Sequence, residues 1–233
     1  MGHNRAARQQ KGSPIVSQLF PKTARSRVRR MPERGHYDAD TIYPIIDEAL
    51  ICHVGFVEAG QPFVIPTLHA RLGDTILLHG ARASRMIKHA EAGGELCITI
   101  TLVDGLVLAR SVFHHSVNYR SAVIFGRGSP IEGEAAQLQA LEAFTERLIP
   151  GRWAEARPPN LNELRQTAIV AVAIESASAK IRSGPPKDDQ EDLDLPLWAG
   201  VLPVTQAFGP PLPDPQLPAG VDLPEYLRGY RRG

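Results

Sequence analysis

The sequence predicts a mainly β fold, in which six or seven antiparallel strands form a barrel with helices at its periphery. Three observations favour this class. Apolar runs rich in Val, Ile, Thr and Phe alternate with turn signals from residue 50 to residue 127. The connections between these runs are short, which favours antiparallel pairing of consecutive strands. With 233 residues, 43% of them hydrophobic, the chain is long enough for one well-packed domain with appendages.

The predicted helices are recognised by their spacing and their ends. The first follows Asp38 and Asp40, either of which can cap it, and its isoleucines recur at helical spacing. The second ends at a pair of glycines and the third at Pro150-Gly151, which are typical helix stops. The predicted helices are Asp38–Leu50, Arg85–Ala92 and Glu134–Ile149.

The predicted strands are apolar runs bounded by turn residues. The fourth and fifth are separated by a predicted turn at Asp104-Gly105. The predicted strands are Leu50–Val57, Pro62–Ala70, Thr75–His79, Glu95–Val103, Leu106–Phe113, Val117–Arg127 and Thr167–Ile174.

The two ends of the chain differ from the predicted barrel at residues 31–184. Residues 1–30 are polar and basic with little periodicity, and we expect a flexible arm rather than a nucleic-acid-binding tail. Residues 185–233 hold ten of the 20 prolines together with apolar clusters such as the one around Trp198. We expect this Pro-rich segment to form an arm that packs on the barrel or on a partner subunit.

Charge and cysteine content exclude several classes of protein. The formal net charge of +1 gives no overall attraction to nucleic acid or anionic membranes. No apolar run approaches the roughly 18 residues of a membrane-spanning helix. Cys52 and Cys97 each lie in an apolar run without the spacing of a disulfide framework or metal site, so we expect two buried thiols. We therefore expect a cytoplasmic protein without nucleic-acid or membrane partners.

A candidate anion site lies in the stretch LHGARASRMIK, where a predicted strand turns into a predicted helix. The hydroxyl of Ser84, the guanidinium of Arg85 and the free N–H groups of the helix start are donors suited to a terminal phosphate. Arg82 is a third candidate. The structural alternative remains open, because Ser84 can simply cap the helix and Arg85 can be a solvated charge.

The strand FVIPTLHAR adds a second part to this candidate site. Pro66 cannot donate to a sheet ladder, so it predicts an edge or an opening in the barrel where a ligand meets exposed backbone groups. A flat heteroaromatic compound with carbonyl and imide edges would suit that opening.

Three motifs taken together, QPFVIP, LHGARASR and NYRSAVIFGR, resemble the flavin-nucleotide-binding split-barrel proteins related to pyridoxamine 5′-phosphate oxidase. Within them the sequence is most similar to the branch of nitroimidazole-resistance (Nim-type) reductases. The resemblance covers roughly residues 27–185 and extends to SAKIRSGPP and WAGVLP. It implies a split β-barrel that forms a homodimer, with FMN bound in a groove at the subunit interface.

The resemblance also implies roles for individual residues. The segment 65–68 would lie along the isoalloxazine ring, His79 and Gly80 would flank the ring or ribityl chain, and Ser84-Arg85 would hold the phosphate. Met86 stands where the oxidases have lysine, so Arg82 or Lys88 would supply the missing contact. For Arg120 on the interface strand, an ordinary ion pair is the alternative. The cofactor-binding residues so implied are Ile65, Pro66, Thr67, Leu68, His79, Gly80, Arg82, Ser84, Arg85, Tyr119, Arg120 and Ser121.

Two functions follow from the resemblance, and no catalytic residue is identified. The first is an FMN-dependent oxidoreductase that passes electrons from NAD(P)H to a nitro compound, quinone or flavin, although FAD can replace FMN. The second is a flavin- or haem-binding carrier or sensor, in which His79 or His114 would be the axial ligand of the haem. The eight histidines show no HxH or HxxxH spacing, so no metal site is expected.

Overall fold

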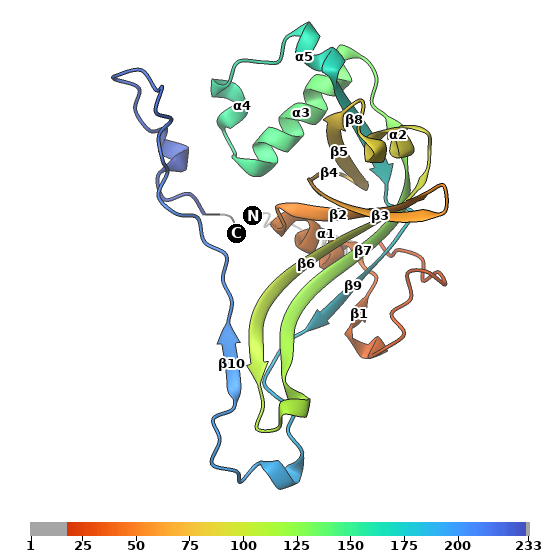
Figure 1. Ribbon diagram of the computed structural model, residues 1–233, viewed down its shortest axis with the longest axis vertical. Coiled ribbons are helices and arrows are strands. Elements are labelled where there is room, and N and C mark those ends of the chain that lie inside the picture. The colour runs from red at the N-terminus through yellow and green to blue at the C-terminus, as the bar shows by residue number, and fades with distance from the viewer. Residues whose placement is uncertain (1–17, 232–233) are drawn as a thin grey trace, which may run out of the picture.

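The computed structural model describes residues 18–231 and shows one antiparallel sheet of ten strands (Figure 1). The strands along its main path follow the order β3-β2-β6-β7-β8-β5-β4, while β10 adds to β6 and β9 lies between β7 and β1. The strands are β1 Gly35–His36, β2 Ile51–Glu58, β3 Gln61–Leu68, β4 Ala70–Leu72, β5 Thr75–Ala81, β6 Glu95–Leu108, β7 Ser116–Pro130, β8 Thr167–Ala173, β9 Ser176–Arg182 and β10 Gly200–Pro203.

The sheet curls into a barrel that stays open on one side. Its main path begins at β3 and ends at β4, two strands separated along the chain by His69 alone. The sheet therefore bends back on itself, and β3 lies beside β5. Within residues 18–231, β3 pairs only with β2, so its other edge is free. This is a split barrel, as predicted, and Pro66 does lie on an edge strand.

The helices cover the ends and one outer face of the barrel. Helix α1 begins after Asp38, whose carboxylate accepts a hydrogen bond of 2.8 Å from the Thr41 N–H. It packs on β6, β7 and β9, while α2 packs on β7 and β8 and α3 on β4. The α-helices are α1 Ala39–Glu48, α2 Arg85–Glu91, α3 Glu134–Leu148, α4 Arg152–Glu155 and α5 Leu161–Gln166.

Two apolar clusters stabilise the chain. The larger fills the barrel and joins α1 to α2; Ile42, Ile46, Ile87, Ile98 and Ile124 in it are fully buried. The smaller cluster lies outside the barrel wall under α3, and in it Phe144 packs with Leu77 and Ile169. Strand β5 contributes to both clusters, because successive side chains point to opposite faces of a strand: Ile76 and Leu78 enter the larger cluster and Leu77 the smaller one.

Two predictions about the strands are wrong. The predicted strands Glu95–Val103 and Leu106–Phe113 are one continuous strand, β6, because Asp104-Gly105 forms a bulge instead of a turn. Residues 112–114 are a short 3-10 helix. Strands β9 and β10 were not predicted, although β9 pairs with the middle of β7 over seven residues.

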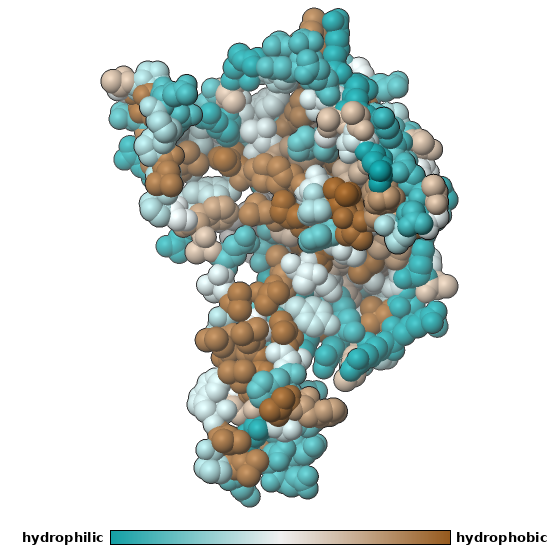
Figure 2. All heavy atoms as spheres, in the orientation of Figure 1, coloured by the Kyte–Doolittle hydropathy of each residue, from teal (hydrophilic) through white to brown (hydrophobic). Residues whose placement is uncertain are grey.

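The two predicted arms differ in how they meet the barrel. Residues 1–17 lie outside the described residues, whereas Phe20 is buried against the main core. The Pro-rich segment adds β10 to β6 and returns along the molecule to α3 and α4, where Tyr230 donates to the Leu148 carbonyl. Apolar side chains gather over β10 and the neighbouring part of β6 (Figure 2). None of the helices among residues 18–231 is long and apolar enough to span a membrane.

Candidate functional site

At the corner between β5 and α2, a serine stands at the N-cap position but its side chain does not cap the helix. Ser84 precedes α2, and within the described residues its hydroxyl makes no hydrogen bond to the helix, so the simple capping role is not observed. Helix α2 has only seven residues. A ligand at this corner must therefore be held by side chains more than by the helix dipole.

Arg85 connects this corner to the free edge of β3. Its guanidinium carbon lies 4.2 Å from the centre of the Phe63 ring, and its Nε is 3.0 Å from a carboxylate oxygen of Glu58. Phe63 lies in β3 and Glu58 ends β2. Both charged side chains are about half exposed, so a ligand phosphate can compete for Arg85.

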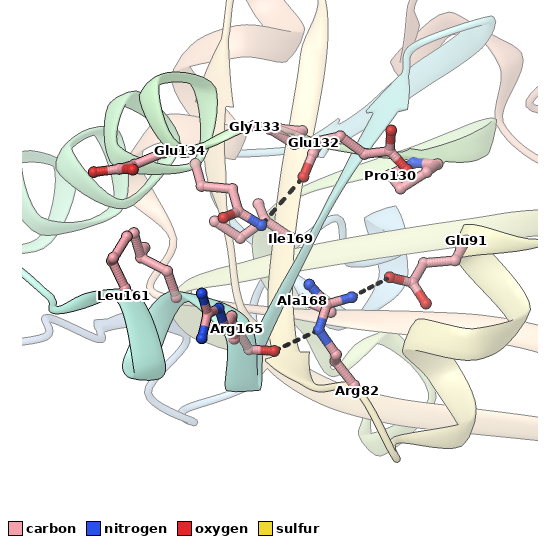
Figure 3. A pocket seen from close by; sticks show the side chains of 13 residues that line it. Arg82, Glu91, Pro130, Glu132, Gly133, Glu134, Leu161, Arg165, Ala168 and Ile169 are labelled. Carbon is pink, nitrogen blue, oxygen red and sulfur yellow. Dashed lines mark hydrogen bonds and ion pairs between the residues drawn. The ribbon is translucent and has the colours of Figure 1, made fainter.

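Arg82 lies on the other side of the corner. Its Nε donates a 2.7 Å hydrogen bond to the Arg165 carbonyl, and its guanidinium is 3.9 Å from Glu91 (Figure 3). Met86, at the position where the oxidases carry lysine, is buried in the main core. The exposed Lys88 lies one helical turn after Ser84.

The predicted ring-binding segment lies along β3. Ile65 and Pro66 are exposed and Thr67 and Leu68 are half-buried. Because the strand has no partner on its outer side among residues 18–231, backbone groups of that edge are available to a ligand. The corner contacts the same strand, since Arg85 lies over the ring of Phe63, two residues before Ile65.

His79 leaves the barrel wall toward α3. Its ring centre is 4.5 Å from that of Phe144, and its Nδ1 is buried without a hydrogen-bond partner in the described part of the chain. Burial lowers the pKa of His79, so the imidazole is neutral at neutral pH. Gly80 has a packing role, because a Cβ there would lie 3.2 Å from Ile87 of α2.

The interface residues predicted on β7 lie away from the corner. Arg120 pairs with Glu48 of α1 and, at 2.8 Å, with Asp104 of the β6 bulge. The hydrogen bonds that Arg120 donates to Glu48, and then those to Asp104, raise the pKa of Arg120, so it stays charged. The Ser121 hydroxyl donates to the Lys180 carbonyl at 3.3 Å, and Tyr119 is half-buried.

One chain alone does not bring these β7 residues to the corner. The other end of β7 contacts α2, where a Cβ on Gly128 would meet the Ala90 carbonyl oxygen at 2.5 Å. Eight residues separate Arg120 from Gly128, which is about 26 Å along a strand. The ion-pair alternative for Arg120 is observed, and its role toward a cofactor or a second subunit stays a prediction.

The sequence reasoning missed Phe63, Glu58 and Arg165 as neighbours of the corner. The signal for the first two was present, because the turn at Ala59-Gly60 pairs Glu58 with Gln61 and places Phe63 two residues on. Nothing in the sequence relates Arg165 to Arg82, which lies 83 residues away.

Of the two cysteines, Cys52 is buried as predicted, but Cys97 is only half-buried. Among residues 18–231, no three potential ligands gather into a metal site.

An open antiparallel barrel with a phosphate-type corner beside its free edge strand defines the class of split-barrel proteins. The chain belongs to the pyridoxamine 5′-phosphate oxidase family, whose model matches residues 38–181. The match confirms the flavin-nucleotide-binding family expected from the three motifs. No curated protein matches the sequence.

Three solved structures are similar to this chain. The flavocytochrome Anf3 from Azotobacter vinelandii is 40% identical over 91% of this chain and 98% of its own, with a TM-score of 0.85. The FAD and haem binding protein from Mycobacterium smegmatis is 35% identical over 84% and 96%, with a TM-score of 0.80. A candidate 5-nitroimidazole antibiotic resistance protein from Bacteroides thetaiotaomicron is 22% identical over 63% and 86%, with a TM-score of 0.53, and shares the fold.

Proposed function

We propose that this protein binds a flavin nucleotide in the opening between β3 and the β5–α2 corner. The observation that carries the proposal is the contact of Arg85 with Phe63, because it joins a phosphate-type donor to the free edge of a strand. A flavin needs both features, since it has a charged phosphate at one end and a flat ring with polar edges at the other.

The residues present fit the two ends of such a ligand. The Ser84 hydroxyl and Arg85 guanidinium would hold the phosphate, with the carboxylate of Glu58 displaced from Arg85. The backbone of residues 65–68 would bond to the polar edge of the ring, and the exposed apolar side chains Val64 and Ile65 would exclude water from it. His79 lies on the α3 side of β5, where burial keeps the imidazole neutral and free of a positive charge.

We further propose that the protein is a flavin-dependent oxidoreductase. The flavin, when bound, supplies the transfer of electrons from NAD(P)H to a small acceptor of the nitro, quinone or flavin type. The chain would orient the ring through the backbone of β3, whose outer edge has no strand partner in the described part of the molecule. Such an open edge fits small acceptors without a dedicated pocket.

Haem binding is a second candidate, and a specific observation favours it. The two similar structures at 40% and 35% identity are named as a flavocytochrome and as an FAD and haem binding protein. Two predicted axial ligands differ in their surroundings. His79 has a buried Nδ1 without a partner in residues 18–231, whereas the Nε2 of His114 is 3.1 Å from Asp189. A protein with both groups would be an electron carrier, a sensor or an oxidase.

An absorption spectrum of the purified full chain tests both candidates. Bands of an oxidised flavin are expected, and anaerobic NADH or NADPH should bleach them until an acceptor is added. A Soret band that is lost in either His79→Ala or His114→Ala would identify the haem ligand. A colourless protein that takes up neither group would contradict the proposed function.

The phosphate assignment is tested by the double variant Ser84→Ala/Arg85→Ala. Loss of a charge-assisted contact of about 1.5–3 kcal/mol should weaken flavin binding roughly 10- to 150-fold. The measurement is the dissociation constant of the flavin, with circular dichroism to show that the fold is intact. Lys187→Ala, a change at a charged residue of the Pro-rich segment, serves as the control. Unchanged flavin affinity in the double variant would refute the assignment.

A further inference from the structure

An open cleft with a volume of about 790 Å³ lies near the start of the described chain, and all of its lining residues belong to the segment 22–37. This segment contains the short 3-10 helix η1, Pro32–Arg34, and strand β1. Figure 1 shows both of them on the β9 side of the sheet, well away from the β5–α2 corner. The family model begins at residue 38, so the cleft lies in a part of the chain that the family domain does not include.

The lining of the cleft is basic. Lys22, Arg27 and Arg29 line it, and no acidic side chain does. All three residues are exposed, and none of them forms an ion pair with a carboxylate among residues 18–231. Residues 1–37 hold nine Lys or Arg and one acidic residue, whereas the whole chain has a formal net charge of +1. Positive charge is therefore concentrated at this end of the chain, and the cleft lacks anions that would balance it.

Hydrogen bonds hold the backbone that carries these cations. The N–H of Val28 donates to the Tyr37 hydroxyl at 2.9 Å, which fixes the chain between Arg27 and Arg29. The N–H of Phe20 donates to the Tyr37 carbonyl at 2.8 Å, and the Phe20 side chain is buried in the main core. The cleft is thus formed before a ligand arrives, so binding does not have to order the segment first.

Lys22 is free to exchange its present contact for a ligand. Its ammonium nitrogen lies 4.5 Å from the centre of the Tyr37 ring, and an exposed cation–π contact of this kind is weak. An anion in the cleft would draw Lys22 away from the ring. One face of Tyr37 would then be open to a flat group such as a nucleobase.

Phosphate groups are the anions that these donors fit. A guanidinium group is a planar set of N–H donors that binds phosphate through two parallel hydrogen bonds, and lysine is a common phosphate ligand. The three cations also match the roughly three to four negative charges of a short phosphate chain. The volume lies within the range of about 300–1,000 Å³ that small-molecule sites occupy, so a small ligand fits this concave site better than a broad macromolecular surface does.

We propose that the cleft binds a ligand with two or three adjacent phosphate groups. The inference is independent of the proposed flavin function, because the cleft shares no residue with the set assigned to the flavin. Two sources carry this chemistry, which are free polyphosphate and the phosphate chain of a nucleoside triphosphate. Both would bind through Lys22, Arg27 and Arg29, and a nucleotide would add the contact of its base with Tyr37.

Isothermal titration calorimetry of the full chain with tripolyphosphate tests the proposal, at low salt because salt screens exposed charges. Arg27→Gln/Arg29→Gln should weaken binding about tenfold or more, the effect of losing at least one charge-assisted contact. Arg30→Gln is the matched control, because Arg30 is an exposed arginine of the same segment that does not line the cleft. Its affinity should stay within about twofold of wild type, and thermal denaturation shows whether each variant is folded.

A second titration with magnesium-free ATP separates the two sources. The double variant should weaken the binding of ATP as it weakens that of tripolyphosphate. Tighter binding of ATP than of tripolyphosphate to wild-type protein would identify a nucleotide as the ligand. Equal binding of the two would identify the phosphate chain alone.

Four results would overturn the proposal. The first is a wild-type protein that does not bind tripolyphosphate, and the second is an equal loss in the double variant and in Arg30→Gln. The third is equally tight binding of citrate, because the cleft would then select charge and not phosphate. The fourth is much tighter binding of a short single-stranded DNA that all three arginine substitutions weaken alike, which would make the segment part of a nucleic-acid surface.

Discussion

At the scale of single residues, Glu58 determines how Arg85 meets a ligand. The carboxylate is 3.0 Å from the Arg85 Nε, so phosphate binding replaces one anion with another. The pair is about half exposed, and exposed pairs contribute little to stability.

We therefore expect Glu58→Gln to tighten flavin binding about two- to fivefold, because an exposed ion pair worth about 0.5–1 kcal/mol no longer competes. Flavin titration at low salt measures the change, and Glu33→Gln, at an exposed carboxylate in a short 3-10 helix, is a suitable control. Weaker binding in Glu58→Gln would mean that Glu58 itself contacts the ligand.

His79 should make the protein less stable in mild acid. Burial lowers its folded-state pKa below the ordinary value, so the unfolded chain binds the proton more readily. The stability from the neutral imidazole is complete above the unfolded pKa of about 6.5 and decreases as the pH falls below that value.

Urea unfolding between pH 7.5 and 5 measures this effect. The loss of stability should be smaller in His79→Leu, which cannot titrate, than in wild-type protein. His36→Leu, outside both apolar clusters, is the comparison. A pH dependence that is identical in wild type and His79→Leu would show that His79 is solvated or has a partner in solution.

At the scale of elements, β7 needs glycine where its backbone lies very close to the backbone of neighbouring elements. A Cβ on Gly126 would lie 2.0 Å from the Ala173 carbonyl oxygen, and backbone at that position cannot move aside easily. Gly126 and Gly128 both lie inside β7, so they serve the close packing of this strand.

Gly126→Ala should lower the free energy of unfolding by about 3 kcal/mol, in the upper range for overpacking. Thermal or urea denaturation measures the loss. Gly209→Ala, where a Cβ would meet no atom within 4 Å, should leave stability within about 0.5 kcal/mol of wild type. Equal stability of the two variants would contradict the packing described for β7.

Most elements were predictable because their signals are local. Helix caps such as Asp38, and runs such as the one that forms β5, depend on neighbouring residues. The bulge at Asp104 was not predictable, because its carboxylate is held by Arg120 from the adjacent strand. Strand β9 has small side chains and no apolar run, so only its pairing with β7 defines it. The corner was found by its motif, whereas its contacts with Phe63 and Arg165 depend on tertiary structure.

At the scale of the whole molecule, the exposed apolar surface supports a second subunit. Large apolar side chains on β6 and β10 are 42–55% exposed, among them Leu106 and Leu202. Apolar atoms gather over this part of the molecule (Figure 2). Patches of this kind commonly mark interfaces. We propose a homodimer that uses this face, in which Arg120 of the β7 strand lies near the other subunit.

Light scattering after gel filtration should give twice the chain mass of 25.4 kDa. Leu202→Asp places a charge in the patch and should shift the protein toward monomer. Leu212→Asp, at a residue 90% exposed on the Pro-rich segment, should remain dimeric. A wild-type monomer would refute the dimer, and a dimeric Leu202→Asp protein would place the interface elsewhere.

The pairing of β5 with β8 sets an order of assembly. The β6–β7 pairing closes only residues 109–115, whereas the β5–β8 pairing brings residues 75–81 onto residues 167–173. Closing a long loop costs more chain entropy, so the hairpin should form first and the β5–α2 corner last. A nucleotide that binds only the finished corner would then stabilise contacts absent from the folding transition state. It would slow unfolding and leave the folding rate nearly unchanged.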